Sequence, residues 1–157
     1  MVELDNKDRE ILAALQQDAS ISVAHLAERV NLTTNPCWRR VKRLEDAGVI
    51  RAKVALLDTA VVGLRTTAFV TIRIDRHAQD WLTEFAAAVE AIPEIVECHR
   101  MTGDIDYLLK VVIADLHHYD LVYKRLIEDI PHLTDVSSAF SMERLKETTA
   151  VDLATLP

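Results

Sequence analysis

A dense group of cations lies near the end of the first third of this 157-residue chain. Six of the 18 Lys and Arg residues fall within residues 39–53, although the chain as a whole carries a formal net charge of -7. Cationic side chains bind phosphate oxygens, and an arginine guanidinium also donates paired hydrogen bonds to the edge of guanine. The group therefore predicts contact with DNA, provided that one element presents these side chains on one surface.

The residues around this group predict three short helices. Apolar residues recur at helical spacing over residues 6–17 and 23–30. Thr33 or Thr34 is a suitable N-cap for a third helix, and Gly48 is well placed to end it in the left-handed conformation. Three short helices, the last two joined by a very short connection, are typical of a helix-turn-helix.

In such a motif the second helix of the pair enters the major groove. The apolar stripe of the third helix turns toward the core, so its opposite side is available to DNA. The sequence predicts these DNA-binding residues: Thr33, Thr34, Asn35, Trp38, Arg39, Lys42, Arg43 and Arg51. Arg40 lies between the two sides and is able to pair with Glu45 or Asp46 instead. The alternative is a solvated basic helix with no partner, but the two preceding helices favour DNA.

The hydrophobic period changes from residue 66 onward, where the chain also becomes acidic. Residues after Asp58 include nine Lys and Arg but sixteen Asp and Glu. Alternating apolar residues predict strands, and helical spacing predicts helices, in this order: strand 66–75, helix 78–92, strands 95–103 and 106–115, helix 116–130 and strand 134–146. The order β-α-β-β-α-β predicts an α+β, ferredoxin-like domain after the helix-turn-helix.

Several other classes of protein are disfavoured by the sequence. The first ten residues are too charged for a secretory signal, and no apolar run approaches the ~18 residues of a membrane span. Cys37 and Cys98 are far apart, so neither a disulfide framework nor a structural zinc site is indicated. We expect a reduced, cytoplasmic protein that needs no cofactor.

A catalytic metal site is the main competing interpretation from another class. It would use residues from this set: His99, Asp104, Asp106, His117 and His118. Neighbouring histidines point to different sides of a helix, and no H-x-x-x-H or similar ligand pair occurs. Phosphate-binding, dinucleotide-binding and serine-nucleophile motifs are missing from the sequence as well. We therefore expect no metal and no enzyme activity.

The order of these motifs resembles the Lrp/AsnC, or feast/famine, family of transcriptional regulators. The matching stretches are LDNKDREILAALQQDA, LAERVNLTTNPCWRRVKRLEDAGVI and CHRMTGDIDYLLKVVIAD. Within the family, the chain looks closest to a branch that controls the breakdown of sulfur amino acids. The resemblance implies a winged helix-turn-helix domain over residues 1–53, a linker strand or wing over 54–65, and an effector-binding and oligomerisation domain over 66–157.

The resemblance also implies dimers that assemble further, into octamers, with an amino acid bound between dimers near a hairpin. Carried onto this sequence, the effector site comprises Arg100, Met101, Thr102, Gly103, Asp104, Asp106 and Tyr107, with Ser138 and Phe140 from the last strand. Either Asp104 or Asp106 suits an ammonium group, and Gly103 allows close approach of a carboxylate to backbone N–H groups. The alternative is that these residues only form a turn. Arg100 stands where a leucine sensor would have an apolar residue.

The sequence thus predicts a regulator of amino-acid metabolism that binds double-stranded DNA and whose DNA binding changes with a small amino-acid effector. The alternative is a metabolite-sensing oligomer that acts on a partner protein instead of DNA. The basic third helix is the feature that favours DNA, since a sensor of proteins has no need of it.

Overall fold

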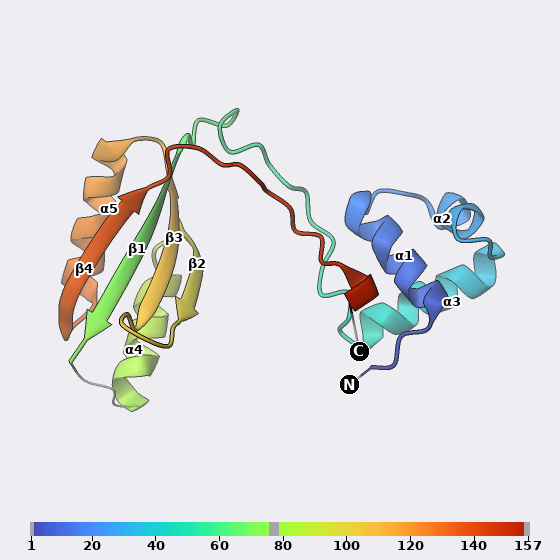
Figure 1. Ribbon diagram of the computed structural model, residues 1–157, viewed down its shortest axis with the longest axis horizontal. Coiled ribbons are helices and arrows are strands. Elements are labelled where there is room, and N and C mark those ends of the chain that lie inside the picture. The colour runs from blue at the N-terminus through green and yellow to red at the C-terminus, as the bar shows by residue number, and fades with distance from the viewer. Residues whose placement is uncertain (1, 76–78, 156–157) are drawn as a thin grey trace. The chain divides into compact units, whose positions relative to one another are not determined.

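The computed structural model describes residues 2–75 and 79–155, which divide into two compact units (Figure 1). The first unit contains residues 1–56 together with residues 146–157, and the second contains residues 57–145. No helix among the described residues is both long and apolar enough to cross a membrane.

Three helices build the first unit: α1 (Asn6–Gln17), α2 (Val23–Arg29) and α3 (Thr34–Asp46). Asp5 caps α1 in a capping box, in which its carboxylate accepts from the Asp8 N–H and the Asp8 carboxylate accepts from the Asp5 N–H. The three helices share one core, whose fully buried side chains include Ile11, Leu26 and Leu44. The helix-turn-helix predicted from hydrophobic spacing is confirmed.

The chain leaves α3 as the sequence predicts but does not form the expected strand. Gly48 has a φ of +70°, in the left-handed region that ends helices. Residues 51–58 then form neither helix nor strand. Val54, Leu56 and Leu57 along this segment are about 70% exposed. A strand needs a hydrogen-bonded neighbour, and the described residues supply none here.

The second unit is a four-stranded antiparallel sheet with two helices on one face (Figure 1). In chain order it comprises β1 (Thr66–Ile74), α4 (Gln79–Glu90), β2 (Ile95–Arg100), β3 (Tyr107–Ile113), α5 (Leu116–Asp129) and β4 (Leu133–Phe140). The strands lie in the order β2-β3-β1-β4, so the ferredoxin-like order of elements is confirmed. The last strand is shorter than predicted and ends at Phe140.

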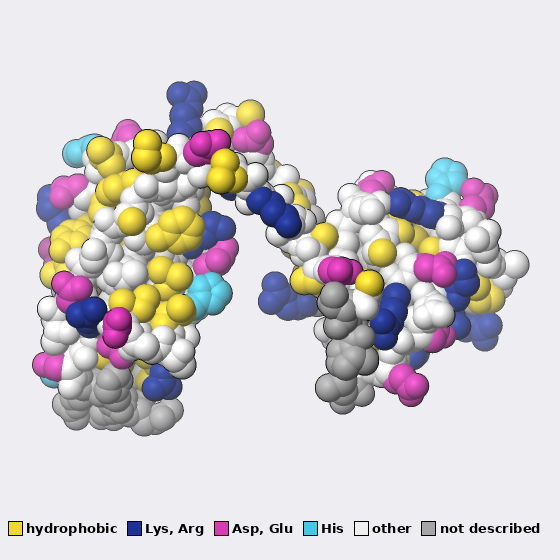
Figure 2. Space-filling model, viewed as in Figure 1, with side chains coloured by type: hydrophobic (Ala, Val, Ile, Leu, Met, Phe, Trp, Pro, Cys, Tyr) yellow, Lys and Arg dark blue, Asp and Glu magenta, His cyan; other side chains and the backbone are white. Residues whose placement is uncertain are grey.

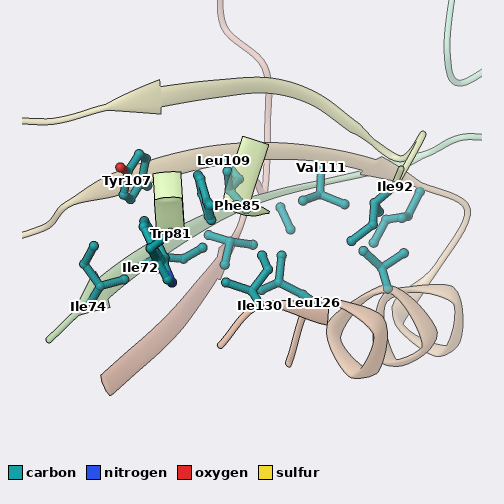
Figure 3. Close-up of a cluster of buried hydrophobic side chains, with 14 residues drawn as sticks. Ile72, Ile74, Trp81, Phe85, Ile92, Tyr107, Leu109, Val111, Leu126 and Ile130 are labelled. Atoms are coloured by element: carbon teal, nitrogen blue, oxygen red, sulfur yellow. The ribbon is translucent and has the colours of Figure 1, made fainter. Parts of the chain in front are cut away.

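Alternate residues of the central strands point toward the helices and form the core of this unit (Figure 3). Ile72 of β1 and Leu109 of β3 are fully buried, and Trp81 and Phe85 of α4 stack with ring centroids 4.9 Å apart. The Trp81 indole N–H donates to the Pro131 carbonyl oxygen at 2.7 Å, so the polar edge of this buried ring is satisfied.

The other face of the sheet carries no helix from this unit. Phe69 of β1 pairs with Lys110 of β3 on one side and Ala139 of β4 on the other, and its side chain is 40% exposed. Hydrophobic side chains gather over the strands on this side of the unit (Figure 2). The described residues of this unit therefore leave one face of the sheet uncovered, with hydrophobic side chains such as Phe69 beside polar ones such as Lys110.

The C-terminal segment belongs to the first unit, whereas the sequence-based division assigned all of residues 66–157 to the second. The side-chain amide of Gln16 donates to the Val151 carbonyl oxygen at 3.1 Å and accepts from the Val151 N–H at 2.7 Å. Leu153, in the short 3-10 helix η1 (Leu153–Thr155), packs against the core of the three helices. This contact joins residues far apart in sequence, so local patterns do not reveal it.

Candidate DNA interface and effector site

All eight residues predicted to bind DNA are exposed, and seven of them lie at the start of α3 or along it. The helix lies in this orientation because Cys37, Val41 and Leu44 are buried in the core at 0%, 5% and 0% exposure. Thr33 is its N-cap, but the Thr33 side chain makes no capping hydrogen bond. The hydroxyl therefore remains available beside the positive end of the helix dipole, a favourable position for a phosphate.

Two shallow hollows lie along this exposed side of α3. One, with a volume of about 470 Å³, is lined by Trp38, Arg39, Lys42, Arg43, Asp46 and Ala47. The other, of about 450 Å³, is lined by Asp5, Pro36, Arg39, Arg40 and Arg43. Trp38 is 54% exposed and thus adds a flat apolar surface among the cations. Such a combination suits a DNA backbone with its sugars and thymine methyl groups.

Arg40 does not pair with Glu45 or Asp46, and that expectation is wrong. Its guanidinium donates to the Asp5 carboxylate at 2.6 Å and to the Asp8 carboxylate at 2.9 Å. The reason is packing, because α1 and α3 contact each other in the three-helix core and bring these residues together. Sequence spacing along α3 alone offers only Glu45 and Asp46.

Glu45 and Asp46 of α3 have other cationic partners. Lys42 pairs with Asp46 at 2.9 Å, one helical turn away, and Lys53 pairs with Glu45 at 2.8 Å. The hydrogen bond to Asp46 and, to a smaller extent, the negative charge of Asp46 raise the pKa of the Lys42 ammonium above its usual value. These pairs are exposed, so a phosphate is able to compete for either cation at little cost.

The predicted effector site begins with the turn between β2 and β3. Gly103 has a φ of +104°, a conformation that side chains rarely adopt. Asp106 is tied to the sheet, because its backbone N–H donates to the Ile72 carbonyl oxygen at 2.9 Å and its carboxylate accepts from the Ile74 N–H at 2.9 Å. Asp104 is exposed at the tip of the turn. The two aspartates therefore differ in how free they are to bind a ligand.

The other predicted effector-site residues do not all lie at the surface of the turn. Met101 and Thr102 lie exposed in the turn beside Arg100. Tyr107 is only 4% exposed, with its ring centroid 4.3 Å from that of Phe85, so within this chain its ring is part of the core (Figure 3). Burial raises the pKa of its hydroxyl above the usual value. Tyr107 thus supports the hairpin from inside and does not line its surface.

Ser138 and Phe140 lie on β4, at the sheet edge opposite β2. The Tyr119 hydroxyl of α5 forms a hydrogen bond with the Ser138 hydroxyl, and the Phe140 ring meets the Tyr119 ring edge-on with centroids 5.0 Å apart. Burial raises the pKa of the Tyr119 hydroxyl above its usual value. Within one chain, therefore, these residues and the hairpin turn form two separate groups.

The candidate metal ligands are also dispersed. His99 contacts Glu97 at 3.3 Å on the open face of the sheet, and His118 of α5 contacts Glu94 at 3.1 Å. Over residues 2–75 and 79–155, no group of three or more His, Cys, Asp or Glu side chains is arranged to hold a metal ion.

Comparison with known proteins assigns both units to families. Residues 4–51 match the winged helix-turn-helix DNA-binding family, and residues 67–151 match the Lrp/AsnC ligand binding domain. The DNA-binding transcriptional activator DecR of Escherichia coli (strain K12) is 49% identical over 150 residues, which cover 96% of this chain and 99% of that protein.

Solved structures are similar along nearly the whole chain. An AsnC family transcriptional regulator from Agrobacterium tumefaciens matches with a TM-score of 0.93 and 50% identity, covering 96% of this chain and 98% of its own. A transcriptional regulator from Neisseria meningitidis, in complex with L-Met, matches with a TM-score of 0.90 and 36% identity, covering 96% and 97%. With both of its domains matched, this chain belongs to the Lrp/AsnC family of DNA-binding transcriptional regulators.

Proposed function

We propose that this protein binds double-stranded DNA through the exposed side of α3 and regulates genes of amino-acid metabolism from the cytoplasm. The observation that carries the proposal is the exposure of every predicted DNA-binding residue while the apolar stripe of the same helix is buried. Arg39 and Arg43 line both hollows, and of these two only Arg39 has no carboxylate partner among the described residues, so Arg39 is central to this surface.

Replacement of Arg39 by Ala tests the DNA surface. Loss of one phosphate contact lowers the slope of the logarithm of affinity against the logarithm of salt concentration by about 0.9. Lys124→Ala is the matched control, since it removes one exposed cation from α5 in the second unit. Equal DNA affinities and equal salt slopes for the two variants would contradict the proposed surface.

The effector is an amino acid that binds at the hairpin turn, with Asp104 as the partner of its ammonium group. The exposure of Asp104 and the hydrogen bond that holds Asp106 to the sheet favour this choice. A sulfur-containing amino acid is the first candidate, because the Neisseria meningitidis relative is described as a complex with L-Met.

A complete effector site requires more than one copy of the chain. The hairpin turn and the β4 residues Ser138 and Phe140 lie at opposite edges of one sheet, so a neighbouring copy has to supply one group. The open sheet face around Phe69 offers a dimer interface, and pairs of dimers then build larger assemblies, up to an octamer. Sedimentation of the protein with and without L-methionine measures these states, and a monomer under all conditions would exclude this arrangement.

A thermal-unfolding screen against all proteinogenic amino acids tests the effector. A ligand present at about 100 times its dissociation constant stabilises the protein by about 2.7 kcal/mol, which raises the unfolding temperature by several degrees. We expect L-methionine or L-cysteine to give this shift, and Asp104→Asn to remove it. If the shift persists in Asp104→Asn, another group binds the ammonium.

A further inference from the structure

The first unit contains a buried acid that contacts the DNA-facing helix from behind. Asp8 of α1 is 1% exposed, and it is the one charged residue that is buried in the described part of the chain. Its carboxylate accepts from the Arg40 guanidinium at 2.9 Å and also from the Arg43 guanidinium. One carboxylate of α1 thus holds two arginines of α3.

Each of these arginines still reaches solvent on the DNA side. The Arg40 side chain is 31% exposed and the Arg43 side chain is 50% exposed. Both line the hollow at the start of α3 together with Arg39. A guanidinium has five N–H donors, so a bond to Asp8 leaves other donors for a phosphate. The buried acid therefore limits the orientation of two long cations without blocking them.

The hollow also has a restrained charge. Three guanidiniums and the Asp5 carboxylate line it, and the buried Asp8 carboxylate binds two of these guanidiniums, so the five groups together have one net positive charge. General attraction to DNA depends on the net charge of the surface. Binding of a phosphate at one particular position is favoured when the guanidinium N–H donors are already oriented toward that position. This arrangement lowers general attraction to DNA and favours one register of the backbone.

We propose that Asp8 is a positioning residue for DNA recognition, which orders Arg40 and Arg43 as a phosphate clamp although it does not touch DNA itself. Arg40 then becomes a DNA contact that the sequence does not predict. Asp8 contributes to the discrimination between the operator and other DNA, and the inference rests on the proposed DNA surface of α3.

Replacement of Asp8 by Asn separates positioning from folding. Asn retains the shape and one acceptor oxygen but removes the charge. Glu10→Gln is the matched control, because it removes one carboxylate from the same helix where the partner is Lys7. The probes are a duplex of about 30 base pairs, or three helical turns, selected by the wild-type protein from a random pool, and a scrambled duplex of equal length.

Asp8→Asn should weaken binding to the selected duplex roughly tenfold, while binding to the scrambled duplex stays the same or strengthens. The salt slope on scrambled DNA should steepen by up to about 0.9, since one more cation is free to meet a phosphate. Glu10→Gln should not change the ratio of the two affinities. A merely structural role for Asp8 would weaken both duplexes in parallel, and that result, like no change at all, overturns the proposal.

A double-mutant cycle tests whether Asp8 acts through its arginines. In the Arg43→Ala background, Asp8→Asn should weaken binding to the selected duplex much less than it does in the wild type.

If Asp8→Asn does not fold, Arg43→Lys takes its place, because lysine keeps the charge but lacks the forked guanidinium that bridges Asp8 and a phosphate. It should weaken only the selected duplex. Failure of Arg39→Ala to change DNA binding refutes the α3 surface itself, whereas an effect of Arg39→Ala with none of Asp8→Asn refutes only the clamp.

Discussion

Replacement of Leu153 by Ala should loosen the DNA-binding unit, although this residue lies 144 positions from its contact Arg9. Leu153 is partly buried against the core of the three helices, and the Arg9 guanidinium donates to its carbonyl oxygen at 3.2 Å. Full burial of a leucine side chain contributes about 1.5–3 kcal/mol, so partial burial gives roughly 1–1.5 kcal/mol. Alanine keeps the backbone carbonyl that accepts from Arg9, so only the packing of the side chain is lost.

Hydrogen exchange of the α1 amides measures this loss within the full chain. A loss of 1.4 kcal/mol speeds exchange through unfolding of the unit tenfold, so we expect acceleration of roughly five- to twelvefold. The matched control is Leu145→Ala, because Leu145 has the same side chain and lies nearby in sequence but is 86% exposed. Equal exchange rates in the two variants would refute the docking of the C-terminal segment on α1.

Three further predictions concern other parts of the molecule. Phe85→Ala should destabilise the second unit by about 3–5 kcal/mol, because it leaves a cavity between α4 and the sheet, and urea unfolding followed by circular dichroism measures the loss. Gly103→Ala should cost roughly 1 kcal/mol in the same assay, from backbone strain alone, since nothing lies within 4 Å of an added methyl group. The hydrogen bond from the Asp8 N–H, and after it the one from Arg40, hold the pKa of the Asp5 carboxyl below its usual value. The ionised Asp5 carboxylate therefore stabilises the first unit fully when the pH is above that usual pKa, and this stabilisation is lost as the pH falls through the lowered pKa. Acid unfolding of the first unit in wild type and Asp5→Asn should therefore differ least at the most acidic pH.

Local features of the sequence were sufficient to predict the five α-helices and the four strands of the described residues, but not the 3-10 helix η1, and the strand expected after α3 does not form. The helix boundaries follow from caps such as Ser22, whose hydroxyl accepts from the His25 N–H, and from hydrophobic spacing. The strands follow from alternation, as in β1, where Ala68 and Val70 are buried and Phe69 is exposed. Each of these signals acts over a few residues, which is why a single sequence contains it.

Contacts between distant elements were not predictable in the same way. Sequence spacing along α3 offers Arg40 only Glu45 and Asp46, and the packing of α1 on α3 brings Asp5 and Asp8 to it instead. Tyr107 has the residue type of a binding site, but the alternation of β3 buries it beneath α4. The docking of Leu153 leaves no periodic signal at all. For the effector site, sequence patterns find the turn and the order of the strands, but not the contacts of Ser138 and Phe140 with Tyr119 of α5.

The ion pairs of the first unit divide its cations into two kinds. Arg40, Lys42, Arg43 and Lys53 have carboxylate partners within 3 Å, whereas no such partner is found for Arg39 and Arg51 among the described residues. A cation that already has a carboxylate partner has to exchange this partner for a phosphate, so it adds little net attraction to DNA. Because the partner holds the cation in one orientation, it still favours one position of the phosphate. A cation without one contributes its full charge to the release of counterions from DNA. The acids around α3 thus reduce the non-specific electrostatic attraction between this basic helix and DNA. The guanidiniums that these acids hold in place favour one position of the phosphate backbone over others.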